Sequence, residues 1–166
     1  MSDLPVFVME RDFKAPPELV WRTWTEADLV GRWYGPGVET KVHEIDVREG
    51  GRWLHEMIMG ERSGYQRMDY IEVEPPHRLV MLMSNTDADW KIVPNPQMPN
   101  WPTMLRTEVT FTPSASGTKM RLEWSPHAAS AQEIETFRAA MDGLHKGWGA
   151  GMEVLETLLE EMQSRA

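Results

Sequence analysis

Histidine is the residue in this sequence best suited to acid–base chemistry near neutral pH, because its imidazole can donate, accept or transfer a proton. The chain has five of them, His43, His55, His77, His127 and His145. None has the spacing of a metal-binding motif, and the sequence contains no cysteine, so we expect neither a metal site nor a cofactor. No motif of a nucleophile or of a phosphate-binding loop occurs, so the sequence marks no catalytic residue.

His55 lies in an expected strand over residues 52–59. Alternation along that strand places Trp53, His55 and Met57 on the same face. His55 should therefore point, with its apolar neighbours, toward the interior of the domain.

Six further strands are expected around it. A strand over 78–84 places Met81 and Met83 on one apolar face. The connections between the strands are short, which favours an antiparallel sheet. The remaining strands are expected over residues 6–13, 40–47, 65–74, 105–112 and 118–124, and two short helices over 18–24 and up to Trp33.

A long helix is expected over residues 131–162. Its apolar residues recur every three or four positions, the period of one helix face. His145 lies beside this apolar stripe, between Met141 and Trp148. If His145 and His55 face one cavity, they would orient a polar group of a ligand or act as an acid–base pair. The alternative is two structural histidines held by hydrogen bonds.

Four glycines interrupt the middle of this helix, and each costs about 1 kcal/mol relative to alanine. Gly143, Gly147 and Gly151 recur every four residues and form a narrow stripe, whereas Gly149 lies off it. The stripe allows a close approach of the sheet, leaves volume for a cavity, or contacts a second copy of the chain. All three interpretations are open at this level.

The segment 85–103 carries four prolines and two tryptophans, Trp90 and Trp101. Loops of this length are uncommon in compact domains and are often functional. It is either a lid or a surface loop anchored by its two indoles.

Composition narrows the class of partner. The net charge is −9, with no basic stripe, so no nucleic-acid partner is expected. No signal peptide and no apolar run of membrane-spanning length occur, so we expect a cytoplasmic protein without a membrane span. Eight Trp and 13 Met favour either a bulky core or an apolar ligand cavity.

A series of short motifs then occurs in a characteristic order. They are APPELVW at 15–21, RWYGP at 32–36, GGRW at 50–53, EPPHRLV at 74–80, GTKM at 117–120 and HKGW at 145–148. Together they resemble the stand-alone bacterial members of the heat-shock protein 90 ATPase activator homologue family, in the START-like (SRPBCC) superfamily. The resemblance covers nearly the whole chain.

The resemblance implies an α+β helix-grip (Bet v 1-like) fold. In this fold a curved antiparallel sheet wraps a long C-terminal helix, two short helices follow the first strand, and an apolar cavity lies between sheet and helix. Trp33 and Tyr34 fall where superfamily cavities usually open. The fold does not fix the activity, because superfamily members include both binding proteins and enzymes.

The sequence thus predicts one domain over residues 1–166 that binds a small, largely apolar molecule, as a monomer or homodimer. The expected ligand-binding residues are Trp33, Tyr34, Trp53, His55, Met57, Met81, Met83, Met141, His145 and Trp148. One alternative is a cyclase or hydrolase that uses the same cavity, with His55 or His145 as the base. Another is a chaperone-interacting module.

Overall fold

The computed structural model describes residues 4–35, 37–96 and 98–165. Within them, alternation and helical periodicity give seven strands and four helices. The strands are β1 (Phe7–Phe13), β2 (Glu39–Ile45), β3 (Arg52–Met59), β4 (Arg62–Glu74), β5 (Arg78–Thr86), β6 (Met104–Pro113) and β7 (Thr118–His127). The helices are α1 (Pro17–Thr25), α2 (Ala27–Trp33), α3 (Ala131–Ala139) and α4 (Met141–Ser164).

All seven strands form one antiparallel sheet in the order β1-β7-β6-β5-β4-β3-β2. Strands β2 to β7 follow one another as a meander, and β1 pairs with β7 at the far edge. The turn Gly60-Glu61 joins β3 to β4 with only two residues, and Gly60 has a positive φ of 67°. This tight turn sets the register that places His55 opposite Gln66.

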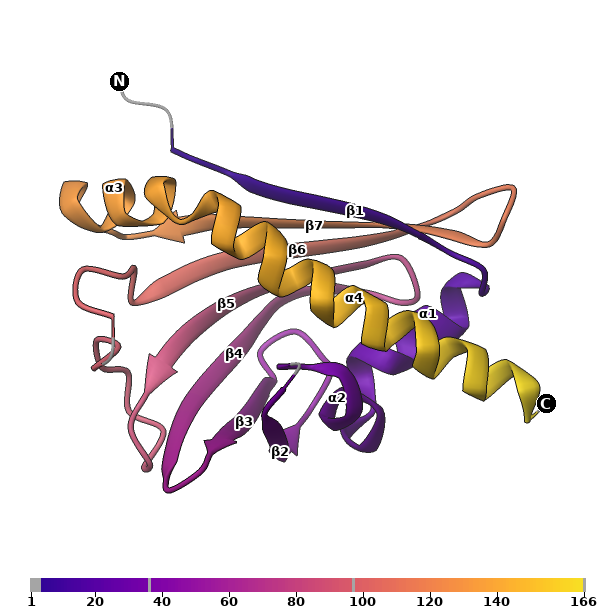
Figure 1. Ribbon diagram of the computed structural model, residues 1–166, viewed down its shortest axis with the longest axis horizontal. Coiled ribbons are helices and arrows are strands. Elements are labelled where there is room, and N and C mark those ends of the chain that lie inside the picture. The colour runs from indigo at the N-terminus through magenta and orange to yellow at the C-terminus, as the bar shows by residue number, and fades with distance from the viewer. Residues whose placement is uncertain (1–3, 36, 97, 166) are drawn as a thin grey trace.

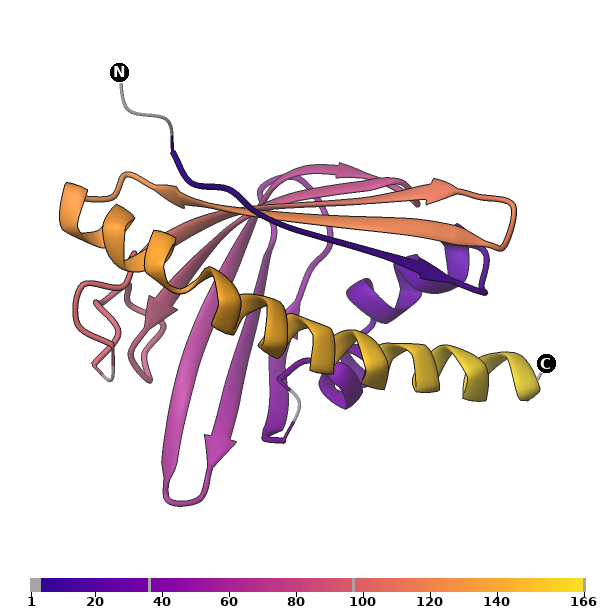
Figure 2. The same cartoon turned by 45° about the horizontal axis from the view of Figure 1, so that its top comes forward.

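The sheet is strongly curved, and α4 lies diagonally across its concave side (Figure 1). Helices α1 and α2 lie at one end of α4, between that helix and the sheet, as the tilted view also shows (Figure 2). The predicted helix-grip architecture, with its two early short helices and its long C-terminal helix, is confirmed.

The core fills the space between the concave face and the helices. Trp24, Trp33 and Trp53 are its largest buried side chains, each at most 1% exposed. Trp33 also donates its indole N–H to the carbonyl of Thr23 at 2.7 Å, so its polar atom is satisfied. Burial of this much aromatic surface is the main stabilising contribution to such a domain.

The C-terminal helix differs from the prediction in one respect. It is two helices, because Ala140 has φ −92° and ψ 0° and its N–H bonds to Phe137 three residues back. The glycines do not cause this break, since α4 continues through all four of them. Phe137 of α3 packs on Trp101, with ring centroids 5.6 Å apart.

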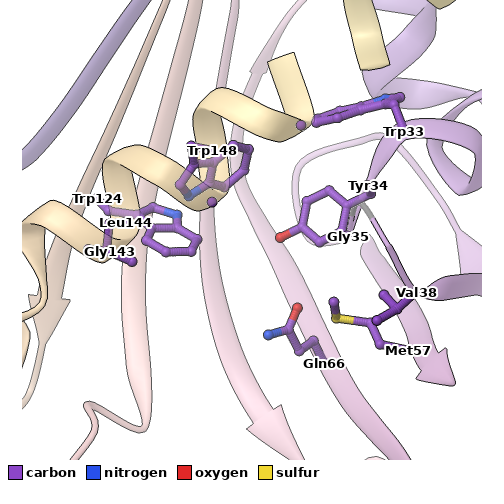
Figure 3. Close-up of a pocket in the computed structure, with 12 residues that line it drawn as sticks. Trp33, Tyr34, Gly35, Val38, Met57, Gln66, Trp124, Gly143, Leu144 and Trp148 are labelled. Carbon is purple, nitrogen blue, oxygen red and sulfur yellow. The ribbon is translucent and has the colours of Figure 1, made fainter. Parts of the chain in front are cut away.

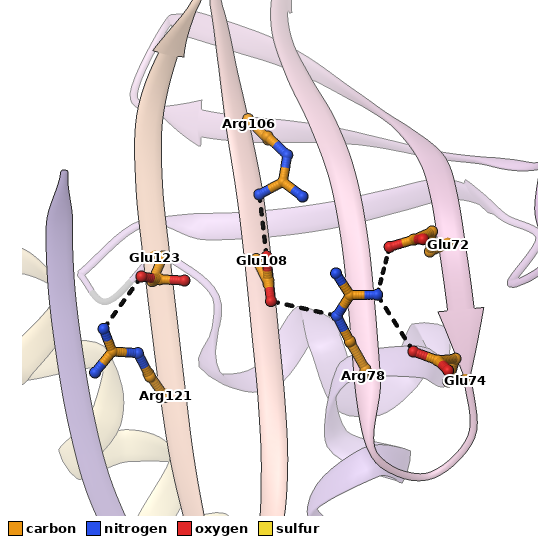
Figure 4. A network of polar contacts seen from close by, with 7 residues as sticks. All are labelled: Glu72, Glu74, Arg78, Arg106, Glu108, Arg121 and Glu123. Atoms are coloured by element: carbon orange, nitrogen blue, oxygen red, sulfur yellow. Dashed lines mark hydrogen bonds and ion pairs between the residues drawn. The ribbon is translucent and has the colours of Figure 1, made fainter. Parts of the chain in front are cut away.

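The outer face of the sheet carries charged side chains in ion pairs (Figure 4). Glu108 accepts hydrogen bonds from both Arg78 and Arg106, at 3.2 and 3.0 Å. Val80, directly opposite Glu108 in the neighbouring strand, is only 1% exposed although it lies outside the main core. The aliphatic stems of such arginines can cover apolar surface while their charged ends stay in water.

The segment that follows β5 is held by its two tryptophans. Trp101 is 8% exposed and belongs to the core. Trp90 packs against His43 and Tyr65, with centroids 5.3 and 5.5 Å apart. These contacts agree with the second interpretation of the sequence, a surface loop anchored by its two indoles.

Candidate functional site

A cavity of about 330 Å³ lies between α4, the end of α2 and strands β3, β4 and β7 (Figure 3). It fits between helix and sheet because the sheet curves away from α4 while the end of α2 covers one side. Its lining residues are Trp33, Tyr34, Gly35, Val38, Met57, Gln66, Trp124, Gly143, Leu144, Gly147, Trp148 and Gly151. None of these is charged, so the described lining is apolar and aromatic with a few neutral polar atoms.

The glycine stripe of α4 forms one wall of this cavity. Gly143, Gly147 and Gly151 all line it, whereas Gly149 does not. A Cβ atom added at Gly143 or Gly147 would meet no other atom within 4 Å. Close packing against the sheet therefore does not account for these two glycines. They leave volume beside α4, as the second of these interpretations expects, and Gly149, outside the lining, likewise has no atom within 4 Å of an added Cβ.

Trp148 is the centre of the aromatic walls. Its ring lies 5.2 Å from that of Trp124 and 5.9 Å from that of Tyr34, both in edge-to-face geometry. Trp33 lies 6.4 Å away on the α2 side. Edge-to-face pairs of this kind add stability beyond burial and hold the rings at fixed angles. The walls are therefore preformed and present flat aromatic surfaces.

Besides the indole N–H groups, the polar side-chain atoms of the lining come from Tyr34 and Gln66. Burial raises the pKa of the Tyr34 hydroxyl well above its ordinary value, so it stays protonated. That hydroxyl contacts the sulfur of Met83 at 3.8 Å. The side-chain Oε1 of Gln66 lies 2.8 Å from Nε2 of His55.

His55 lies behind Tyr34 and Gln66 and contacts both of them. It is fully buried, and burial lowers its pKa to about 4 even though the hydrogen bond with Gln66 favours the protonated form. The ring is therefore neutral at physiological pH. It also packs edge-to-face on Tyr34 at 4.9 Å, so one imidazole contacts both polar residues of the cavity.

A second cavity of about 250 Å³ adjoins the first, and Met57 and Gln66 line both. It is more polar, with Ser63, Asn85 and Thr86 among its lining residues. Gln66 thus lies at the boundary between an apolar and a polar compartment.

The structure brings four of the ten predicted site residues into the first cavity, namely Trp33, Tyr34, Met57 and Trp148. Four others, Trp53, His55, Met81 and Met83, are buried in the core and do not line the cavity, each at most 4% exposed. Trp33 and Tyr34 are themselves 1% and 8% exposed, which makes them walls rather than an open mouth.

The remaining two predicted residues lie elsewhere. His145 is exposed, and its ring packs on Phe7 of β1 at 4.7 Å. Met141 is partly buried against the core and does not line the cavity. His55 and His145 therefore do not face one cavity, because the helical turn that carries His145 points it toward the β1 edge.

Outside the glycine stripe, sequence reasoning missed five lining residues, namely Gly35, Val38, Gln66, Trp124 and Leu144. Gln66 lies on the strand whose two faces both mix polar and apolar residues, so alternation alone could not orient it. The register with β3 was the missing signal, since it pairs Gln66 with His55. Trp124 lies at the end of the strand expected over residues 118–124 and also lines the cavity.

Two classes of feature do not occur in the part of the chain that the structure describes. Its histidines and carboxylates form no cluster of three that could hold a metal ion. None of its helices combines the length and apolar character needed to cross a bilayer.

Fold and cavity together define a helix-grip protein with a largely apolar pocket between its sheet and its long helix. The family model described as "Activator of Hsp90 ATPase homolog 1-like protein" matches residues 14–160. The chain therefore belongs to this family, and the resemblance seen in its sequence motifs is confirmed.

Solved structures agree on the fold. Protein Ms6760 from Mycobacterium smegmatis has a TM-score of 0.75 at 21% identity, with 95% of this chain and 96% of that chain covered. Protein CV1439 from Chromobacterium violaceum gives 0.72 at 22% identity, with coverages of 93% and 96%. A protein from Arthrobacter aurescens gives 0.78 at 19%, with 94% and 86% covered. A search of curated proteins found no relative of significant similarity.

Proposed function

We propose that this protein binds a small, largely apolar molecule in the cavity between the sheet and α4. The observation that carries the proposal is the glycine stripe. Gly143 and Gly147 each weaken the helix by about 1 kcal/mol relative to alanine, yet neither is needed for packing. This loss of helix stability is explained if a ligand occupies the volume beside the helix.

The aromatic walls support the same function. Ligand sites are typically concave and mostly apolar, with a few polar groups that fix the orientation of the ligand. Trp33, Trp124 and Trp148 supply the apolar surface, and Tyr34 and Gln66 supply the polar atoms. In this proposal Trp53, His55 and Met83 hold Tyr34 or Gln66 in place through direct contacts, and Met81 contributes only to the core.

The acid–base alternative has weaker support. It needs two titratable groups on one cavity, but His145 packs on Phe7 while His55 is buried behind Gln66. The described lining contains no histidine and no carboxylate. We therefore propose binding, rather than proton-transfer catalysis by this pair, as the role of the cavity.

A neutral hydrocarbon probe tests the proposal. We expect 2-ethylnaphthalene to quench the tryptophan fluorescence of the protein with saturation, because Trp148 and Trp124 line the cavity. In Gly147→Leu the new side chain occupies the cavity, so affinity should fall roughly tenfold or more. Gly149→Leu is the matched control, since Gly149 lies on the same helix outside the lining.

Native mass spectrometry of protein purified from its own host is the second measurement. A retained small molecule that is lost in Gly147→Leu but kept in Gly149→Leu would support the proposal. Equal probe affinity in both variants and in the unmodified protein would refute it, because the probe would then bind outside the cavity.

A further inference from the structure

Four residues that line the cavity carry hydrogen-bond donors in their side chains. The indole N–H groups of Trp124 and Trp148, the hydroxyl of Tyr34 and the amide of Gln66 belong to lining residues. Trp124 Nε1 is buried and has no hydrogen-bond partner among the described residues. Tyr34 and Gln66 can also accept, so whether they donate to a ligand depends on what else they bind.

Tyr34 is free to donate. Its hydroxyl hydrogen bond goes to the sulfur of Met83 at 3.8 Å, and a thioether is a weak acceptor. A hydroxyl rotates at little cost, so a stronger acceptor in the cavity would replace the sulfur. Since burial holds the Tyr34 pKa far above neutral, the proton is available throughout the physiological range.

Gln66 is oriented by His55. Only one hydrogen is available between His55 Nε2 and Gln66 Oε1, which lie 2.8 Å apart, so the neutral imidazole carries it on Nε2 and donates. His55 Nδ1 is then a bare acceptor, consistent with its having no partner. If the Gln66 amide were flipped, its nitrogen would donate to His55 Nε2, and the neutral ring would carry its hydrogen on Nδ1. That buried N–H would have no partner, which is the less tolerated arrangement.

In this orientation Oε1 of Gln66 accepts the hydrogen bond from His55, and the amide nitrogen can donate to a ligand in the cavity. Gln66 Nε2 makes no hydrogen bond within the described chain. Tyr34 and Gln66 both contact His55, and Figure 3 shows the Gln66 amide oxygen on the side of the Tyr34 hydroxyl and the amide nitrogen on the other side. Two residues with available donors therefore line the same cavity, and no described side chain of the lining is charged.

We propose that the ligand is an uncharged, flat ring molecule with a carbonyl oxygen, and that this oxygen accepts hydrogen bonds from the Tyr34 hydroxyl and the Gln66 amide. The inference rests on the proposed function and adds the class of ligand. Aromatic ketones, quinones and lactones have this chemistry. A carboxylate would lose its hydration without gaining a cation, which is unfavourable.

Three probes of one shape test the ligand class. They are 2-acetylnaphthalene, 2-ethylnaphthalene and 2-naphthoate, titrated by tryptophan quenching. The ketone should bind roughly tenfold more tightly than the hydrocarbon, because it gains hydrogen bonds from prepositioned donors. The carboxylate should bind most weakly of the three.

Substitutions in the protein test whether the carbonyl of the ligand contacts Tyr34. Tyr34→Phe should lower ketone affinity roughly tenfold and leave hydrocarbon affinity unchanged. Tyr70→Phe is the control, since its hydroxyl is also buried, without a partner, and outside the lining. Asn85→Ala, which removes a side chain that lines the second cavity and not the first, should leave both affinities unchanged.

Infrared spectroscopy gives a readout that needs no variant. The stretch of a ¹³C-labelled ketone carbonyl should shift to lower frequency in the complex than in a hydrocarbon solvent, and Tyr34→Phe should reverse part of that shift. Equal binding of ketone and hydrocarbon with an unshifted stretch would overturn the carbonyl contact but leave apolar binding intact. Tightest binding by 2-naphthoate would overturn the neutral class. Failure of all three probes to bind would overturn the proposed function itself.

Discussion

The indole of Trp148 on α4 stacks on that of Trp24 on α1, with ring centroids 6.2 Å apart and planes inclined by only 10°. Trp24 is 1% exposed and belongs to the core, whereas Trp148 is partly exposed and lines the cavity. This one contact therefore connects the packing of the core to the shape of the cavity.

We expect Trp148→Ala to lower both stability and ligand affinity. Its ring contacts four other aromatic side chains, so its loss should reduce the free energy of unfolding by about 3 kcal/mol. Urea denaturation followed by circular dichroism measures the loss. Trp90→Ala is the control, because Trp90 packs only against His43 and Tyr65 among the described rings and should affect stability alone. Unchanged affinity for 2-ethylnaphthalene in Trp148→Ala would contradict the role of Trp148 as a wall.

Alanine at Gly143 or Gly147 should stabilise the protein. Each added Cβ meets open space, and alanine favours the helix by about 1 kcal/mol relative to glycine. The midpoint of urea unfolding should therefore rise in both variants. Gly35→Ala is the opposite case, since Gly35 has φ +71° and its Cβ would lie 2.8 Å from Cε of Met57. A loss of stability in Gly147→Ala would show that the stripe is packed after all.

Stability should fall in mild acid because of His55. The unfolded chain binds a proton at this histidine below pH 6.5, whereas the folded protein does not until about pH 4. Between these values the unfolded state binds more protons, so stability decreases as pH falls, by about 3 kcal/mol in total. Above pH 6.5 both states are neutral, and the contribution no longer changes.

His55→Gln isolates this effect, because its amide can still donate to Gln66 but cannot be protonated in this range. The free energy of unfolding, measured from pH 7.5 to 4.5, should fall more steeply in the unmodified protein than in the variant. The four other histidines occur in both proteins and cancel in the comparison. Parallel pH profiles would show that His55 is not buried as a neutral group.

Glu108 should contribute stability at neutral pH and lose it in strong acid. Burial raises the pKa of this carboxyl, but the hydrogen bonds from Arg106 and Arg78 outweigh burial, so its pKa lies below the ordinary value (Figure 4). The contribution is therefore present above the unfolded pKa of 4.5 and disappears as pH falls through the lower folded value.

Glu108→Gln should accordingly cost about 1 kcal/mol at pH 7 and much less at pH 3, as measured by urea denaturation. The control is Glu135→Gln, which removes an exposed pair with Arg138 on α3 and should change little at either pH. A cost for Glu108→Gln that is the same at both pH values would point to lost packing instead of lost charge.

The sequence by itself determined the elements that have a strong local period. The strand Arg52–Met59 was predicted with its observed bounds, because glycine turns stand at both of its ends. The class of fold followed from such periods and from the order of the family motifs. Local periodicity, however, states only which face of an element is apolar.

The tertiary structure determined which other segments pack against each face of a helix or strand. The register of β3 and β4 joined His55 to Gln66, and the break at Ala140 set the path of α4 across the sheet. That path turned His145 toward Phe7 and left Gly143 and Gly147 over open volume. A cavity arises where curved surfaces fail to meet, and this depends on distances between segments far apart in the chain, which no local pattern contains.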